Sequence, residues 1–450
     1  MRAEEQYLPN SRIPVVKHFG TPYEDAMRRD FTINSLFYNI QTRCIEDFSH
    51  RGIHDLKRGI IVTPLSPFMT FHDDPLRVLR AIRFAVRFEF DLAEELRLAA
   101  QSRRVHESLI CKVSRERVGT ELEGMLTGKA AKPLKALQLI SELGLSDSIF
   151  LIGAKEDPLS YGVLSLSPSL TTKQHHEDKI NGDMSQSYEQ LTTFEDREHY
   201  RLLGWEEAKE RTLLVGNVLD FFNDTSKLPH NSTAITTTLD ERLFLLSTYL
   251  SPFKDLMWTE PGKAKVYRVA SNSMLKEGIK FKNGDVNALD CILSHVDSFR
   301  DILHCIRTTD TPHCDRLQVG ILIRDSKQLW ITALLLAAIC EIRLSQTKDE
   351  SEHSKTELIS TILRSCETLY TFVAEQNLDE CWKQPLLLNG KEIMKALDLG
   401  KRGGPIIGIL IEEQWKWILT NPQGTKCECE DYLKQTRAEV EARFAESNNR

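Results

Sequence analysis

Residues 73–84 read Asp-Asp-Pro-Leu-Arg-Val-Leu-Arg-Ala-Ile-Arg-Phe, and they carry an acid and three arginines at helical spacing. Asp74 and Arg77 lie three residues apart, and Arg80 and Arg83 continue the series at the same step. A carboxylate beside a guanidinium with five N–H donors suits the Watson–Crick edge of a nucleobase, and further arginines suit phosphates. The alternative is an amphipathic helix whose arginines are solvated and whose Asp74 is only a cap.

The same stretch has the signals of a helix start. Asp74 supplies a carboxylate for the N-cap, and Pro75 stands in the first turn, where its missing N–H has no consequence. Leu76, Leu79 and Ile82 then follow at helical spacing. The sequence therefore predicts a helix that runs from Asp74 and presents its acid and its arginines together.

Three other segments accompany this helix. Residues 24–34 read Glu-Asp-Ala-Met-Arg-Arg-Asp-Phe-Thr-Ile-Asn, and residues 47–56 read Asp-Phe-Ser-His-Arg-Gly-Ile-His-Asp-Leu. Residues 114–126 read Ser-Arg-Glu-Arg-Val-Gly-Thr-Glu-Leu-Glu-Gly-Met-Leu, which has the form of a capped helix start. In this order, the four segments resemble motifs B, C, E and (in 73–84) D of the class II tRNA nucleotidyltransferases, the CCA-adding enzymes, and of their bacterial poly(A) polymerase relatives. The diagnostic part covers about residues 20–135.

Weaker similarity continues toward the C-terminus. It runs through residues 276–281, 324–325 and 385–422, and it looks like the helical C-terminal part of the eukaryotic form. The resemblance implies a template-independent enzyme that adds C and A residues to tRNA 3′ ends, with CTP and ATP as substrates.

The resemblance also assigns roles to individual residues. Asp74 and Arg77 match the pair that reads the base in this family, and Asp30 matches a residue close to the sugar. The full set of nucleotide-binding residues that it implies is Arg29, Asp30, Asp74, Arg77, Arg80 and Arg83. A structural role is the alternative for motif B, as a cap or a core ring, and it is the better interpretation for Phe31 and Asn34.

One family motif has no match in the sequence. The family's chemistry needs a strand bearing Asp-x-Asp upstream of motif B, whose carboxylates hold magnesium ions. The 450 residues contain no Asp-x-Asp, so we assign no catalytic residue and no metal ligand, although Mg²⁺ is the cofactor that the resemblance implies. We expect a chain cut short at its N-terminus, and we treat its catalytic competence separately from its family.

Three hypotheses on function follow. The first is the CCA-adding nucleotidyltransferase, which motif D does not distinguish from CC-, A- or poly(A)-adding relatives. The second is a catalytically inactive protein that binds nucleotide or tRNA. The third, and weakest, is a metal phosphohydrolase, because His54-Asp55 and His72-Asp73 are the only His-Asp pairs.

Composition describes an ordinary soluble globular protein. Of its residues, 41% are hydrophobic and 27% charged, and the net charge of −7 argues against indiscriminate polyanion binding. The most apolar stretch, residues 329–339, is too short to span a bilayer and predicts a buried helix, so we expect no membrane partner. The ten cysteines include no Cys-x-x-Cys, which favours reduced thiols. We expect a cytoplasmic protein, with the nucleus or mitochondria as further locations; the sequence leaves the oligomeric state open.

The predicted fold is mostly α: a small α/β nucleotidyltransferase head remnant followed by an all-helical neck, body and tail. The head is expected over residues 1–64 and the nucleotide-selecting neck over 65–130. The body is expected over 131–260, with a polar insertion at about 156–199, and the tRNA-binding C-terminal body and tail over 261–450.

Local patterns predict several individual elements. Strands are expected at 43–48 and 60–63, and helices at 91–105 and 134–143. The glycine-rich turn at 400–405 is expected to lead into a long helix that contains Trp415 and Trp417. A phosphate-binding or RNA-binding role for that turn is the alternative.

Overall fold

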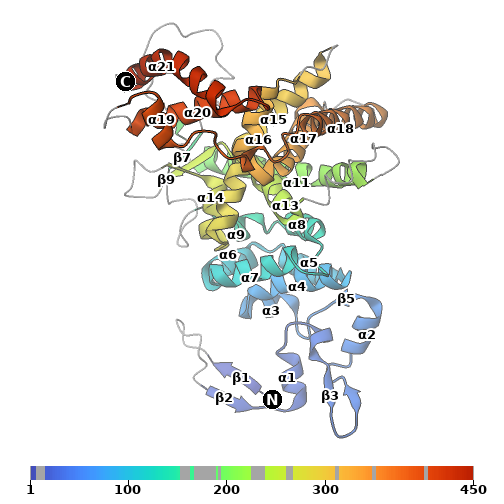
Figure 1. Cartoon of the computed structure of the whole chain (residues 1–450). Helices are drawn as coiled ribbons and strands as arrows, with labels where there is room; N and C mark the ends of the chain where they lie inside the picture. The colour runs from blue at the N-terminus through green and yellow to red at the C-terminus, as the bar shows by residue number, and fades with distance from the viewer. Residues whose placement is uncertain are drawn as a thin grey trace. The chain divides into compact units, whose positions relative to one another are not determined.

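The computed structural model describes residues 2–6, 16–152, 163–166, 189–190, 194–223, 239–259, 267–309, 314–346, 351–399 and 404–448. The chain forms two compact units. Figure 1 shows its helices and strands, coloured from the N-terminus to the C-terminus. The first comprises residues 1–217 and 240–290, and the second comprises 218–239 and 291–450. Both units are mostly helical, as predicted from the sequence.

The first unit begins with short strands and one capped helix. Strands β1 (Arg2–Gln6) and β2 (Val16–Phe19) pair antiparallel, as do β3 (Phe37–Asn39) and β4 (Cys44–Glu46). Helix α1 (Pro22–Met27) starts with a capping box between Thr21 and Glu24, and the 3₁₀ turn η1 (Thr32–Ser35) follows. Phe31 is fully buried and contacts Phe84 edge-on, which confirms its predicted core role.

Helices α2 (Gly52–Arg58), α3 (Pro67–Asp73) and α4 (Leu76–Phe88) come next. The strand expected at 60–63 is present as β5 (Ile60–Ile61), which pairs in parallel with β6 (Asp91–Leu92). The single helix predicted over 91–105 is wrong. Its first residues form β6, and the rest divides into α5 (Glu94–Ala100) and α6 (Arg103–Lys112), because Ser102 has an extended backbone between them.

Helix α4 carries the acid and arginine series. Its apolar residues Leu76, Leu79 and Ile82 are buried, as their spacing predicted. The helix starts slightly later than expected, since Pro75 occupies the N-cap position and Asp74 precedes it. Asp74 still acts as a cap, because its Oδ1 accepts a hydrogen bond from the backbone N–H of Leu76 at 3.2 Å. Helix α7 (Arg115–Leu126) packs along α4.

The remainder of the first unit is helical with one small sheet. The helix predicted at 134–143 is confirmed as α8 (Pro133–Glu142). The other helices are α9 (Ser146–Ile149), α11 (Phe194–Asn223, of which 218–223 belong to the second unit), α13 (Glu241–Leu250), the turn η2 (Ser251–Phe253) and α14 (Ala270–Ser273), which continues into the π-helical turn η3 (Met274–Gly278).

The sheet corrects the expectation of an all-helical body. Its order is β10 (Tyr267–Val269), β9 (Leu256–Thr259), β7 (Val163–Leu166) and β8 (Glu189–Gln190). Val163 pairs with Thr259, so the sheet depends on long-range contacts that a local pattern does not reveal. Apart from β7, β8 and the start of α11, the expected insertion at 156–199 lies outside the described residues.

The second unit consists of helices in the part that the structure describes. They are α15 (Asn283–Thr308, of which 283–290 belong to the first unit), α16 (Arg316–Ser326), the turn η4 (Lys327–Leu329), α17 (Trp330–Ser345), α18 (Glu352–Glu375), the turn η5 (Cys381–Lys383), α19 (Gly390–Ala396), α20 (Gly404–Thr420) and α21 (Lys426–Asn448).

Two predictions for this unit are confirmed. Helix α17 is buried from Trp330 to Ile342, as expected for the most apolar stretch. It belongs to a helical run, Arg316–Ser345, whose length and apolar composition would suffice to cross a membrane, but 67% of its apolar window is buried in the structure, which is typical of a core helix. Helix α20 contains Trp415 and Trp417; residues 400–403 of the preceding turn lie outside the described residues.

Candidate functional site

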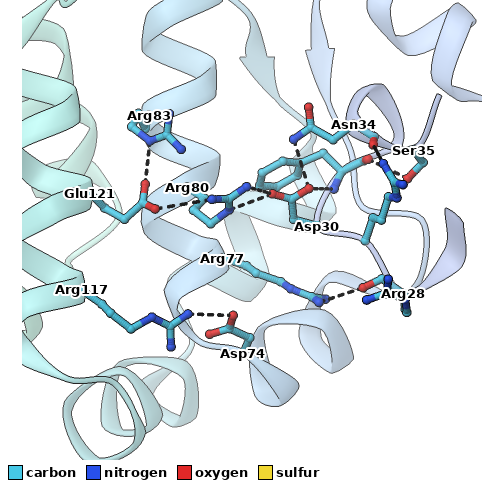
Figure 2. A network of polar contacts seen from close by, with 12 residues as sticks. Arg28, Asp30, Asn34, Ser35, Asp74, Arg77, Arg80, Arg83, Arg117 and Glu121 are labelled. Atoms are coloured by element: carbon cyan, nitrogen blue, oxygen red, sulfur yellow. Dashed lines mark hydrogen bonds and ion pairs between the residues drawn. The ribbon is translucent and has the colours of Figure 1, made fainter. Parts of the chain in front are cut away.

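A cavity of about 600 Å³ lies in the first unit between α4 and the segment from α1 to η1. Five of the six nucleotide-binding residues predicted from the sequence line it, namely Arg29, Asp30, Asp74, Arg77 and Arg80. Figure 2 shows Arg80 of α4 facing Asp30 and Arg77 of α4 facing Arg28, while the side chains from α7 face α4 and Asp74. Segments about 45 residues apart in the sequence therefore share one site.

Asp30 lies at the centre of the hydrogen-bond network (Figure 2). Its Oδ1 accepts from the backbone N–H of Phe31 at 2.9 Å and from Nδ2 of Asn34 at 3.1 Å. Its Oδ2 accepts from Nε and Nη2 of Arg80 at 2.8 and 2.6 Å. Four donors thus hold this carboxylate in one orientation.

Arg80 lies between two carboxylates. Besides the ion pair with Asp30, its Nη1 is 3.6 Å from Oε1 of Glu121, and its guanidinium lies 5.5 Å from the centre of the Phe84 ring. Burial alone would lower the pKa of Arg80, but Asp30 and the other nearby carboxylates outweigh it and raise the pKa above its ordinary value. Arg80 therefore remains a fixed positive charge in the cavity wall.

Asp74 and Arg77, the pair expected to read a base, stand near the start of α4. Nη2 of Arg77 donates to the backbone carbonyl of Arg28 at 2.8 Å. Oδ1 of Asp74 caps Leu76, and Oδ2 lies 3.3 Å from Nη2 of Arg117, which comes from α7. Both side chains keep unused hydrogen-bonding positions, because the guanidinium has five N–H groups and each carboxylate oxygen has two lone pairs.

Arg29 is held from three sides. Its Nη2 is 2.9 Å from Oδ2 of Asp25, and its Nη1 donates to the backbone carbonyl of Asn34 at 2.8 Å. Its guanidinium also lies 4.5 Å from the centre of the Phe37 ring. These contacts pre-orient the charge toward the cavity that Arg29 lines.

The structure places Arg83 elsewhere. It is not among the cavity-lining residues; its Nε donates to Oε2 of Glu121 at 2.6 Å, and its guanidinium lies 4.6 Å from the centre of the Phe84 ring. Glu121 is 8% exposed, so the Arg83–Glu121 ion pair ties α4 to α7 in a mostly buried setting.

Sequence reasoning missed several lining residues, among them Arg28 and Arg117, and interpreted Asn34 as structural. Asn34 does both, since it lines the cavity and holds Asp30. Arg28 was visible as the first of two adjacent arginines. Arg117 lies in residues 114–126, the segment that resembles motif E, but no local pattern indicated that its partner would be Asp74.

Helix α7 is itself fixed from its buried side. Nε of Arg115 donates to the carbonyl of Gly278 at 2.5 Å and Nη1 to that of Ser148 at 3.0 Å, and Nη2 donates to Ile149. Burial lowers the pKa of Arg115 to about 10, which leaves it cationic at neutral pH. Gly119 lies so close to the carbonyl oxygen of Ile279 that a Cβ atom there would overlap it.

The cavity favours an anionic ligand. Five arginines and two aspartates line it, the arginines being Arg28, Arg29, Arg77, Arg80 and Arg117. Guanidinium groups that are already oriented by protein contacts bind phosphate oxygens with little loss of side-chain entropy. A nucleobase edge beside Asp74 and Arg77, with its phosphates toward the other arginines, is the ligand that this distribution suits.

The same residues do not fit a magnesium site. Within the described residues, no group of three or more His, Cys, Asp or Glu side chains is placed to hold a metal ion. Asp30 and Asp74 already face arginines. His54 is exposed and lies 3.6 Å from its neighbour Asp55, whose buried carboxylate accepts a hydrogen bond from Thr32 at 2.8 Å, so Asp55 already has a structural partner.

Comparison with known proteins places these observations in a family. The Poly A polymerase head domain family matches residues 1–62. The chain is similar to "CCA tRNA nucleotidyltransferase, mitochondrial" of Saccharomyces cerevisiae, with 31% identity over 96% of this chain and 72% of the relative. It is also similar to "tRNA nucleotidyltransferase cca2" of Schizosaccharomyces pombe, with 30% identity over 96% of this chain and 74% of that protein.

A solved structure supports the fold alone. The crystal structure of the Bacillus stearothermophilus CCA-adding enzyme in complex with CTP superposes with a TM-score of 0.50. The match covers 95% of this chain and 77% of that one at 16% identity.

Proposed function

Because this chain belongs to the family of CCA tRNA nucleotidyltransferases, we propose that its cavity binds CTP and ATP for addition to tRNA 3′ ends. The observation that carries the proposal is the cavity itself. It is lined by five residues that the sequence predicted to bind nucleotide, namely Arg29, Asp30, Asp74, Arg77 and Arg80. The Saccharomyces cerevisiae relative is named a CCA tRNA nucleotidyltransferase, and the Bacillus CCA-adding enzyme was solved in complex with CTP.

The geometry supports a division of work in this cavity. Asp74, a pure acceptor, is suited to the exocyclic amino group that cytosine and adenine share, while Arg77 donates to ring acceptors on the same edge. Arg29 and Arg80 present charge to sugar and triphosphate, and Asp30 orients Arg80. Arg83 contributes indirectly, because its ion pair with Glu121 stabilises the position of α4.

Transfer of the nucleotide needs groups other than those that would select it. The family's Mg²⁺ chemistry requires two closely placed carboxylates, and neither Asp30 nor Asp74 is available for that role. We therefore assign no step through a metal to these residues. The second candidate is a protein that binds nucleotide and tRNA without transferring, since both cavity carboxylates are engaged by arginines.

Substitution of Asp74 tests the site. We expect Asp74→Ala to weaken CTP and ATP binding about tenfold or more, because a hydrogen bond to a charged group is lost at the base edge. Equilibrium binding of labelled CTP and ATP measures this without requiring transfer. Arg104→Ala, an exposed arginine on α6, is the matched control and should bind like the wild type. Unchanged affinity in Asp74→Ala would remove α4 from the site.

Incorporation distinguishes the two candidates. Labelled CTP and ATP are offered with tRNA that lacks its 3′ CCA, and the 3′ ends of the products are sequenced. If the wild type adds CCA and Asp74→Ala does not, the result supports the CCA-adding transferase. If the wild type adds only C, only A or a poly(A) tract, the protein is a nucleotidyltransferase with a different product. Tight tRNA and nucleotide binding without addition supports the inactive binder.

Two further assignments belong to the proposal. The four-part division at residues 1–64, 65–130, 131–260 and 261–450 is kept as a head, neck, body and tail, with the tail contacting tRNA. The yeast relative carries "mitochondrial" in its name, and we place this chain in the cytoplasm and in mitochondria. Imaging of a tagged full-length protein against markers of both compartments tests the placement.

A further inference from the structure

We infer that Arg117 is a positioning residue that orients Asp74 and thereby sets the preference for amino-bearing bases, an inference that rests on the proposed function. Arg117 belongs to α7, outside the segments expected to touch the nucleotide. It lines the cavity all the same, and its Nη2 is 3.3 Å from Oδ2 of Asp74.

The two oxygens of Asp74 have different neighbours. Oδ1 accepts from the backbone N–H of Leu76, which fixes it to the first turn of α4, and Oδ2 faces Arg117. The Leu76 bond, at 3.2 Å, restrains only one of the two oxygens and leaves the carboxylate a range of χ2 angles, which are broadly distributed for aspartate. The second contact, from another helix, selects one orientation.

Arg117 is well placed to impose that orientation, because α7 is held on its opposite side. Arg115 donates to the carbonyls of Gly278, Ser148 and Ile149, and Gly119 packs directly on Ile279. Glu121 in the next turn binds Arg83 of α4. The helix that carries Arg117 is therefore a fixed support, while the Arg117 side chain itself remains half exposed (46%).

Orientation of Asp74 matters for the choice of base. A carboxylate oxygen accepts from the amino groups of cytosine and adenine but repels the carbonyl oxygens at the same position of uracil and guanine. Both effects weaken if the carboxylate turns away. Loss of Arg117 should therefore reduce the difference in affinity between the two pairs of nucleotides, rather than lower all affinities equally.

The test measures the binding of CTP, ATP, UTP and GTP, each alone, to the full-length wild type and variants. We expect Arg117→Ala to weaken the binding of CTP and ATP about three- to fivefold, as for loss of a partly exposed ion pair. The affinities for UTP and GTP should stay within about twofold of the wild-type values. Arg117→Lys should restore most of the preference, because only one nitrogen of Arg117 contacts Asp74. Thermal melting checks that each variant folds.

A double variant separates positioning from direct contact. If Arg117 acts through Asp74, Arg117→Ala should change no affinity by more than twofold when Asp74→Ala is already present. Equal weakening of all four nucleotides, or the same loss in both backgrounds, would mean that Arg117 binds the triphosphate itself and would overturn the inference alone. A wild type that binds none of the four would overturn the proposed function, and the inference with it.

Discussion

Glu121 shows how much of the site depends on a single side chain that no ligand needs to touch. It is nearly buried, and its two oxygens face Arg80 and Arg83 on α4. Arg80 in turn holds Asp30. One carboxylate of α7 therefore contacts two guanidinium groups of α4 and helps to fix the helix that lines the cavity.

Removal of Glu121 should destabilise the protein. Glu121→Ala leaves Arg83, whose side chain is 17% exposed, without its partner. We expect a loss of about 2–3 kcal/mol in the free energy of unfolding, less than for a fully buried pair because both arginines keep some contact with water. Urea denaturation followed by circular dichroism measures the change.

Glu107→Ala is the matched control for this loss. Its partner Arg103 is 92% exposed, so we expect a change within about 0.5 kcal/mol. Equal stability of the two variants would show that the contacts of Glu121 contribute no more than a surface ion pair.

At the scale of elements, α7 connects the cavity to the rest of the first unit. One face of the helix reaches α4 through Arg117 and Glu121, and the other lies against the turn η3 and the residue after it, Ile279. Gly119 permits this close approach, because any side chain would overlap the carbonyl oxygen of Ile279. The need for glycine here is steric, since Gly119 lies within a regular helix.

Gly119→Ala should therefore displace α7. We expect a loss of about 2–3 kcal/mol in stability from overpacking against backbone atoms, together with weaker CTP binding. Gly216→Ala is the control, because a methyl group there meets nothing within 4 Å among the described residues. Alanine in that helix should be neutral or stabilising by about 0.5–1 kcal/mol. A Gly119→Ala variant as stable as Gly216→Ala would contradict the packing argument.

At the scale of the whole molecule, the chain divides into two compact units, each with its own core. In the second unit, Leu388, Ile393, Leu397, Leu410, Cys429, Leu433 and Val440 form a buried cluster. The fully buried Gln414 accepts from the backbone N–H of Leu388 at 2.7 Å and donates to its carbonyl at 3.0 Å. That side chain joins α20 to the start of α19.

Gln414→Ala tests whether the two units are energetically separate. We expect a loss of about 2 kcal/mol, because both polar groups of Leu388 lose their partner in a buried setting. Hydrogen exchange followed by mass spectrometry should show faster exchange in α19 to α21, with CTP affinity within twofold of the wild type. Gln423→Ala, an exposed residue of the same unit, is the control. Weakened CTP binding in Gln414→Ala would instead mean that the units are coupled.

Much of the site was predictable because it depends on local spacing. Arg77 and Arg80 recur at a helical interval on α4, and the apolar residues Leu76, Leu79 and Ile82 are buried, so one helical pattern predicted the directions of both groups of side chains. Prediction failed where pairing depends on distant residues. The helix expected over 91–105 lost its start to the β5–β6 pair, and the sheet that joins β7 to β9 has no local signature.

The order of the four segments and the helical step from Arg77 to Arg83 were properties of the sequence alone, because neighbours on a helix are set by backbone geometry. The tertiary structure decided which charge meets which. Asp30 meets Arg80 across 50 residues, Asp74 meets Arg117 across 43, and Arg83 turns to Glu121. Such pairings arise from how helices pack, and a side chain's partner across a packing interface is not encoded in its own neighbourhood.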